Sequence, residues 1–229
     1  MKPFRRLVLL LAGPGVALAA GIATDGTVGP RQQLNGAGGF VIPDTLGSRR
    51  GGNLFHSFDD FQIGQGESAT FTQTQSGAIS SIFARVTGRA SSTINGDLKS
   101  SVPGANLYFF NPHGVFFGPK ATVDIDGSFA VSTADHLTFT DGSVFSATPT
   151  ASGDSLTTAA LGSFGFLTNS PSAVEFSGTQ LMMNSGRSLT VVAGDILAPD
   201  QSNIAPWRQR PAAFHRSDAR QCCRAFLCR

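Results

Sequence analysis

The first 221 residues of this chain contain no cysteine, and its three cysteines, Cys222, Cys223 and Cys228, lie within the last eight positions. Disulfides commonly support small exported domains, so a fold built from the first 221 residues must depend on packing and backbone hydrogen bonds. The spacing of the three cysteines matches no zinc pattern, because Cys-x4-Cys alone supplies too few ligands. We therefore predict no metal site and no cofactor.

Charged residues are also scarce, at 14% of the chain, whereas soluble domains typically have about a quarter. The formal charge of +2 is misleading, because basic residues gather at both ends. Between Ala20 and Pro199 there are 8 basic and 13 acidic residues, a net charge of −5. The central region is thus mildly acidic and lacks the basic footprint of a nucleic-acid-binding protein.

Tyrosine and tryptophan are rare among the aromatic residues: the chain has one of each, against 19 phenylalanines. Carbohydrate clefts favour aromatic side chains with a polar handle. The phenylalanines instead indicate stacked rings inside a core.

Residues 1–19 have the features of a signal peptide. A positively charged start precedes an apolar stretch interrupted by Gly13-Pro14-Gly15, and Ala17-Leu18-Ala19 fits the small-x-small cleavage pattern. The apolar run is too short for a stable membrane-spanning helix. We predict that the exported form begins near Ala20; an N-terminal membrane anchor is the alternative. Export predicts a periplasmic or extracellular location.

Short apolar and β-branched segments dominate the remaining sequence, and Asn-Gly, Asp-Gly and Gly-Pro pairs separate them. This pattern predicts many short strands joined by tight turns. Phe40–Pro43 is an early example, and Leu189–Ile196 is the last clear one. Phe55, Phe58 and Phe61 are spaced by three, so a short helix is the alternative there.

Two all-β architectures fit this pattern. An antiparallel sandwich would use the glycine turns as hairpins. A parallel β-helix would use Gly96, Gly114, Gly127 and Gly142 as corners of successive coils, which need about 20 or more residues each. Periodicity alone favours the β-helix only weakly.

The sequence gives little support for catalytic residues. Asp124 and Asp126 would share one face of a strand, and some parallel β-helices are polysaccharide lyases or hydrolases. We expect solvated aspartates at strand ends instead. His56 has no nucleophile motif and no second histidine at metal spacing, which predicts a surface or capping residue.

Three segments, in this order, resemble the secretion domain of filamentous haemagglutinin-like exoproteins, also called the haemagglutination activity domain, which is the N-terminal part of two-partner secretion substrates. They are Asn53–Phe61, Asn111–Val115 and Gly127–Asp135. His113 and Val115 depart from the family's Asn-Pro-Asn-Gly-Ile signature. The resemblance implies a right-handed parallel β-helix with N-terminal capping strands, which we assign to residues 20–198.

The resemblance also implies a role other than catalysis. Such domains leave the cytoplasm through the general secretory machinery and are recognised by the periplasmic domains of an outer-membrane β-barrel transporter. The protein would then be adhesin-like, with a possible host or cell-surface receptor. The resemblance also implies that it is secreted or lies at the cell surface, which it reaches through the periplasm of a Gram-negative-type cell. A β-helical carbohydrate-active enzyme and a surface adhesin without a dedicated partner are the alternatives. The residues implied in transporter recognition or in the turn motif are Asn53, Phe55, His56, Phe58, Phe61, Asn111, Pro112 and Gly114.

The turn within Asn111–Val115 also has a local physical basis. Pro112 presets φ at the second turn position, and Gly114 tolerates a positive φ. The side chain of Asn111 can bond the backbone two residues on. The residues therefore predict a tight corner between two buried aromatic strands.

Residues 199–229 differ from the preceding domain. They contain six arginines, all three cysteines and the single tryptophan, Trp207, without strand alternation. We expect this tail to be disordered or translated in a non-native frame, in a truncated exoprotein; a genuine basic tail is the alternative.

Overall fold

The computed structural model of the chain describes residues 21–34, 36, 39–148 and 154–199, together with the backbone of 203–206 and 224–228. The predicted signal peptide and most of the tail lie outside these residues. Among the described residues, no helix has the length and hydrophobicity needed to cross a membrane.

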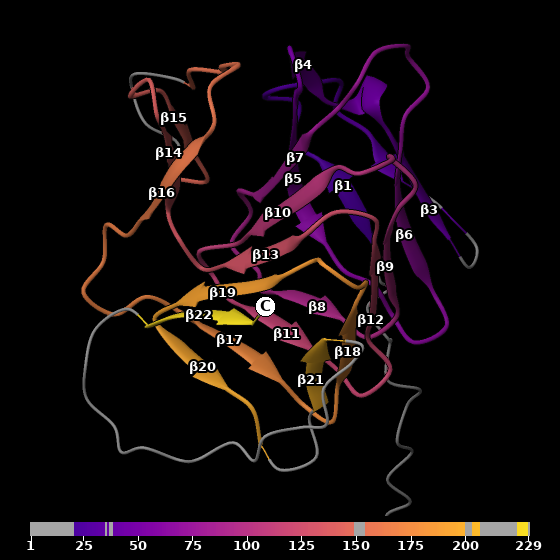
Figure 1. Cartoon of the computed structure of the whole chain (residues 1–229), viewed down its shortest axis with the longest axis vertical. Coiled ribbons are helices and arrows are strands. Elements are labelled where there is room, and N and C mark those ends of the chain that lie inside the picture. The colour runs from indigo at the N-terminus through magenta and orange to yellow at the C-terminus, as the bar shows by residue number, and fades with distance from the viewer. Residues whose placement is uncertain are drawn as a thin grey trace, which may run out of the picture.

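Three parallel sheets run along the molecule, and the chain visits them in turn, as a solenoid does (Figure 1). Sheet A contains the parallel strands β5 (Asn53–Phe61), β7 (Ser81–Val86), β10 (Asn106–Phe110), β13 (Phe129–Ser132) and β19 (Leu189–Ala193). Sheet C contains β8 (Ser92–Ile94), β11 (Val115–Phe117), β17 (Ala173–Phe176) and β20 (Asp195–Leu197). Sheet B contains β3 (Phe40–Pro43), β6 (Ser68–Thr72), β9 (Asp97–Ser100) and β12 (Thr122–Ile125).

The register of sheet A stacks like residues on successive coils. One inward column consists of Leu54, Ile82, Leu107, Phe129 and Leu189, all buried. Burying a large apolar side chain contributes about 1.5–3 kcal/mol, so such columns supply much of the stability that disulfides do not. The parallel β-helix is confirmed and the antiparallel sandwich is excluded.

Short strands cover the N-terminal end of the solenoid. β1 (Ile22–Thr24) and β4 (Ser48–Arg50) pair antiparallel with β5, and β2 (Gln33–Leu34) pairs with β1. A single 3-10 turn, Asp44–Leu46, connects β3 to β4. The predicted capping strands are therefore present.

A bulge explains the spacing of the phenylalanines in β5, which is a strand and not a helix. On β1, Ala23 pairs with Asp60 but Thr24 pairs with Phe58, so Asp59 is skipped. The extra residue places both Phe58 and Phe61 on the core side. Phe55 points to the opposite face and joins a different apolar cluster.

Three of the four predicted corner glycines lie between coil strands. Gly96 joins β8 to β9, Gly114 joins β10 to β11, and Gly127 joins β12 to β13. The prediction that Gly142 lies at a corner between coils is wrong. It lies in the tight turn between β14 (His136–Phe139) and β15 (Val144–Ser146).

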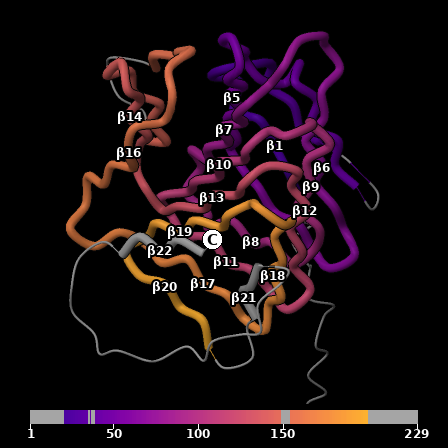
Figure 2. The backbone as a smooth tube through the Cα atoms, viewed as in Figure 1, coloured from indigo at the N-terminus to yellow at the C-terminus, as the bar shows by residue number. Residues whose placement is uncertain are grey.

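β14, β15 and β16 (Leu161–Gly165) form a separate antiparallel sheet that the sequence analysis did not predict. We call this unit the strap. It is inserted between β13 and β17, and it lies to one side of the stacked strands (Figure 2). β13 pairs directly with β19 across the insertion, so the ladder of sheet A is continuous without the strap.

The C-terminal part differs from expectation in two details. The predicted strand over Leu189–Ile196 is two strands, β19 and β20, on different sheets. Within the tail, β21 (Asn203–Pro206) pairs parallel with β18 (Gln180–Met183), and β22 (Arg224–Cys228) pairs antiparallel with β19. The remainder of the tail lies outside the described residues, and its proposed origin stays a prediction.

Candidate functional site

The first motif forms β5, whose two faces have different environments. Phe58 and Phe61 belong to the core inside the solenoid. Their ring centroids are 5.0 Å apart, and the ring of Phe61 lies 4.8 Å from that of Phe109. Phe109 precedes the second motif by two residues, so the core packs the first motif against the strand that leads into the second.

The sequence analysis predicted that His56 is either a surface or a capping residue. His56 is fully buried, so it is not a surface residue. Its ring lies 5.9 Å from that of Phe58 and 5.4 Å from that of Phe71. Neither ring nitrogen has a hydrogen-bond partner among the described residues. Burial lowers the pKa of His56 to about 4, and the nearby carboxylate of Asp44 only partly opposes this. The neutral imidazole lies against Gly47, which follows the 3-10 turn, and so supports the cap.

The outward face of sheet A has a ladder of aromatic rings. Phe55, Phe83 and Tyr108 stack on successive coils, with centroid distances of 5.2 and 4.9 Å. Phe139 and Phe145 of the strap pack onto this ladder, within 5.8 and 5.1 Å of Phe55. Predicted site residue Phe55 therefore belongs to the interface between solenoid and strap, not to the inner core.

Asn53 holds the returning part of the strap. Its side-chain amide donates to the carbonyl oxygens of Thr157 and Ala159, at 2.9 and 2.8 Å. The side chain is buried. Asn53 thus fixes the segment that leads into β16, which lies more than a hundred residues further along the chain.

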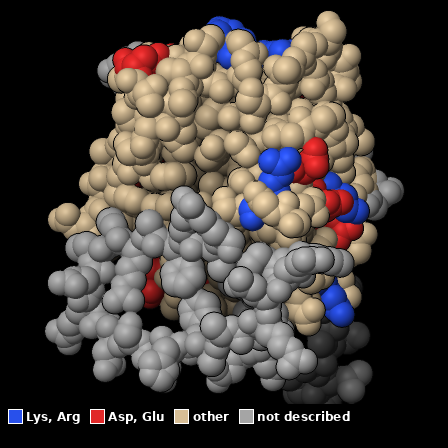
Figure 3. All heavy atoms as spheres, in the orientation of Figure 1, with Lys and Arg blue, Asp and Glu red and all other residues tan. Residues whose placement is uncertain are grey.

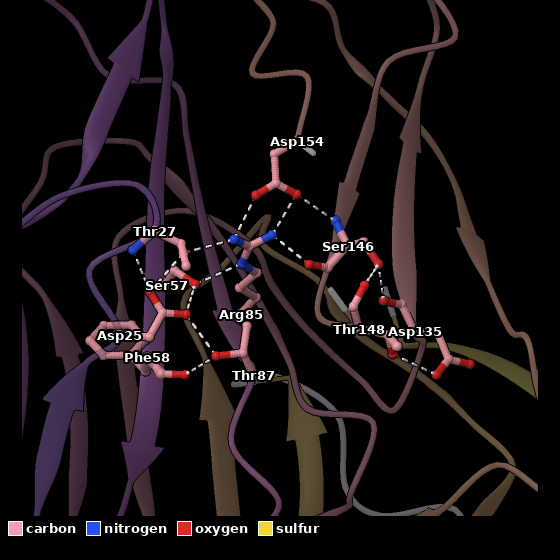
Figure 4. Close-up of polar contacts among 10 residues, drawn as sticks. All are labelled: Asp25, Thr27, Ser57, Phe58, Arg85, Thr87, Asp135, Ser146, Thr148 and Asp154. Carbon is pink, nitrogen blue, oxygen red and sulfur yellow. Dashed lines mark hydrogen bonds and ion pairs between the residues drawn. The ribbon is translucent and has the colours of Figure 1, made fainter. Parts of the chain in front are cut away.

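Arg85, which the sequence analysis missed, is the polar centre of the same interface (Figure 4). Its side chain is 3% exposed and forms an ion pair with Asp154 at 2.6 Å. It also donates to Ser57 Oγ at 2.7 Å, to Thr27 Oγ1 at 2.9 Å and to the carbonyl oxygen of Ser146. Because Asp154 and Ser146 come from the strap region, a buried cation joins strap, cap and solenoid.

Asp25 extends this network into the N-terminal cap. It accepts hydrogen bonds from Ser57 and Thr87, both at 2.6 Å, and from Thr27. Burial opposes ionisation of Asp25, but these hydrogen bonds outweigh it and lower its pKa. The carboxylate therefore remains charged and holds the loop after β1 against the first two coils.

The second motif forms the corner between β10 and β11. The Asn111 side chain is fully buried, and its Oδ1 accepts a hydrogen bond from the backbone N–H of His113 at 2.9 Å. The predicted local bond is confirmed, and Gly114 has the predicted positive φ, at 109°. His113 therefore keeps the turn geometry despite its departure from the family signature.

The Asn111 corner also contacts the coils on both sides. Its Nδ2 donates to Ala90 O and Ser92 Oγ on the preceding coil, both at 3.0 Å. On the following coil, Ser172 Oγ donates to Pro112 O at 2.6 Å. These contacts depend on the stacking of coils, so no local sequence signal could have shown them.

The acidic pair considered for catalysis has the solvated position that was expected. Asp124 and Asp126 are exposed on the outside of sheet B, and Asp126 accepts from the backbone N–H of Gly104 at 2.6 Å. Among the described residues, no group of three or more metal-binding side chains occurs. On the described part of the face in Figure 3, charged side chains form small clusters on a mostly uncharged surface.

The solenoid, its N-terminal cap and the Asn111 corner together define a capped parallel β-helical domain. Over residues 20–218 the sequence matches the TPS secretion domain family, and the chain belongs to that family of two-partner secretion domains. Among curated proteins, no match was found.

Family membership has consequences for the cell biology of the chain. It identifies the chain as a two-partner secretion substrate, which implies an exoprotein exported across the outer membrane and an outer-membrane transporter as partner. The family is one of secretion and adhesin domains and not one of enzymes.

Proposed function

We propose that this domain is the secretion signal of an adhesin-like exoprotein and that the periplasmic domains of an outer-membrane β-barrel transporter recognise it. The single observation behind the proposal is the family match over residues 20–218. The preserved geometry of the Asn111 corner adds support, because this motif carried the resemblance.

The composition suits passage through a pore in an extended state. No cysteine occurs before Cys222, so no premature disulfide can form within the first 221 residues in the oxidising periplasm. An extended segment can be recognised by strand addition to a sheet edge of the partner. Once outside, coils that bury their inward columns would oppose movement back through the pore.

The proposal is tested by export of the full chain with a candidate transporter, measured as the ratio of secreted to cell-associated protein. Asn111→Ala and Gly114→Val are expected to reduce this ratio. Asn95→Ala is the matched control, because Asn95 lies at another corner, where its Oδ1 accepts from the N–H of Lys120 at 3.1 Å.

Stability of the purified, refolded variants separates recognition from folding. A lower secreted fraction in a variant that remains stable supports recognition of the motif. Unchanged secretion in both motif variants would show that the Asn111 corner is an ordinary turn and would contradict the proposal, as would export that does not depend on any transporter.

A further inference from the structure

His56 is a titratable residue in the core without a hydrogen-bond partner, and no part of the proposed function uses this property. Its ring is fully buried, and neither ring nitrogen has a donor or acceptor among the described residues. Buried polar groups are normally hydrogen-bonded, because an unpaired one costs free energy. The rings of Phe58 and Phe71 lie 5.9 and 5.4 Å from the imidazole, so its surroundings are apolar and suit only the neutral form.

A short segment of the N-terminal cap lies against this imidazole. We call the segment, residues 44–50, the flap; it comprises the 3-10 turn and β4. A Cβ atom on Gly47 would lie 3.0 Å from both Nδ1 and Cε1 of His56, so the backbone of the flap packs directly on the ring. Pairing of the flap with β5 is limited to the three residues of β4. A change at the ring therefore acts on a weakly paired segment.

Two charged side chains fasten the flap to the loop between β6 and β7. Asp44 Oδ1 accepts hydrogen bonds from the N–H and the hydroxyl of Thr74, at 3.0 and 2.6 Å, and its Oδ2 accepts one from the N–H of Gln75 at 3.0 Å. Arg49 donates to two carbonyl oxygens further along the same loop, at 2.9 and 2.7 Å. The flap and this loop therefore form one unit, which depends on the position of Asp44.

Of the charged groups that the structure describes, Asp44 is the one that acts on the His56 ring. Burial opposes ionisation of Asp44, but its hydrogen bonds to the loop outweigh burial and lower its pKa. Both of its oxygens are thereby occupied. Strands β1, β3 and β6 contain no charged residue. The other charged residues on neighbouring elements are exposed or have another partner: Arg49 on the loop, Arg50, Asp25 with Ser57, Asp59, Asp60 with Gln62, and Arg85 with Asp154.

We propose that His56 is an acid-sensitive latch: protonation of its ring lifts the flap from β5 and frees the loop after β6, while the coils from β7 onward stay stacked. An imidazolium without a partner is strongly disfavoured in an apolar core. Its charge can be relieved in two ways. Asp44 can leave the backbone of the loop and pair with the ring, or the flap can open and admit water. Both routes release the flap, because Asp44 and the contact at Gly47 hold it in place.

The pH window of the latch follows from the two environments of the ring. With the flap closed, burial lowers the pKa of His56 to about 4, and an open flap returns the ring to water and to its ordinary value of 6.5. The open form therefore takes up a proton first and is favoured as the pH falls from 6.5 to about 4. Asp44 stays ionised over this range because its pKa is lowered. The latch acts on the folded domain, so it goes beyond the proposed function and requires no transporter.

The experiment measures hydrogen exchange of the purified full chain between pH 7 and pH 4, with each rate divided by that of an unfolded peptide at the same pH. Amides of the flap and of residues 74–78 should lose protection by about 100- to 300-fold over this range. Amides of β13 and β19 should remain more strongly protected than those of the flap at every pH. Equal protection of both regions at each pH would indicate global unfolding and would overturn the inference.

Three variants assign the acid response to the latch. His56→Phe removes the titrating group, so its flap should keep the same protection from pH 7 to pH 4. His113→Gln is the matched control, because His113 is an exposed histidine at a different corner, and this variant should retain the full acid response. Asp44→Asn removes one of the two acceptors that bind the loop and should raise exchange of the flap already at pH 7. An acid response that persists in His56→Phe would contradict the latch.

An NMR titration of the unsubstituted chain makes the test independent of whether His56→Phe folds. The Cε1–H resonance of His56 and the amide resonances of the flap should titrate with one common midpoint. A flap that stays unchanged while the ring takes up its proton would show that His56 does not control it.

Discussion

The two faces of sheet A are covered by different parts of the molecule. The inward face is covered by the solenoid itself, because each coil places its residues on those of the coil before. The outward ladder is covered by the strap, whose strands come later in the chain, together with Val28 of the N-terminal cap. The comparison shows that repetition of coils builds the inner core, whereas a separate insertion builds the second apolar cluster on the outer face.

Truncating an inward ring should have the largest effect. Phe61→Ala removes a fully buried ring that contacts Phe58, Phe71 and Phe109, and we expect a loss of about 3–5 kcal/mol in the free energy of unfolding. The matched outward change, Phe83→Ala, should cost less because the strap can readjust over the gap. Denaturant unfolding measures both; equal losses would abolish the contrast between the faces.

The inward face should also respond to acid through His56. Its pKa is about 4 in the folded chain, below an unfolded value of about 6.5, so folding favours the neutral ring. The stability that the neutral His56 ring contributes is fully present above pH 6.5, and it is lost as the pH falls from there to about 4. The shift corresponds to about 3 kcal/mol over that window.

His56→Phe isolates this contribution, because a phenylalanine does not titrate. The variant should lose less stability than the unsubstituted chain between neutral pH and pH 4, as measured by denaturant unfolding at each pH. Parallel pH profiles for the two proteins would contradict the buried neutral histidine.

Changes at the Asn111 corner should have an intermediate effect, because the corner connects coils without filling the core. Gly114 has a φ of 109°, a region that β-branched residues avoid. Gly114→Val should therefore reduce stability by about 1–3 kcal/mol. Thermal unfolding of the refolded domain provides the measurement, and an unchanged melting temperature would show that the corner tolerates the strain.

Deleting residues 200–229 should have the smallest effect. The composition of this tail departs from that of the solenoid, and the described part of sheet A already buries Leu189 and Val191 of β19 in the core. We expect the melting temperature to remain within a few degrees. A loss of several kcal/mol would instead show that the pairing of β22 with β19 caps the solenoid.

Local patterns predicted the parts of the fold that depend on neighbouring residues. The short apolar segments located strands such as Phe40–Pro43, which is β3, and glycine turns located three corners. The Asn111 turn followed from its own four residues, and its bond to His113 is present. The spacing of Phe55, Phe58 and Phe61 was ambiguous, because the bulge at Asp59 requires the pairing of β5 with β1.

The sequence by itself determined an all-β chain with buried phenylalanines, no disulfide support before Cys222 and a corner at Asn111. Only the tertiary structure decided that Phe55 faces outward, that His56 is buried with no hydrogen-bond partner in the described part of the chain, and that Arg85 pairs with Asp154. The physical reason is distance along the chain. Arg85 and Asp154 are 69 residues apart, and the residues next to either one do not indicate that the two form an ion pair. Such pairs form only when stacked coils and an inserted strap bring their side chains together.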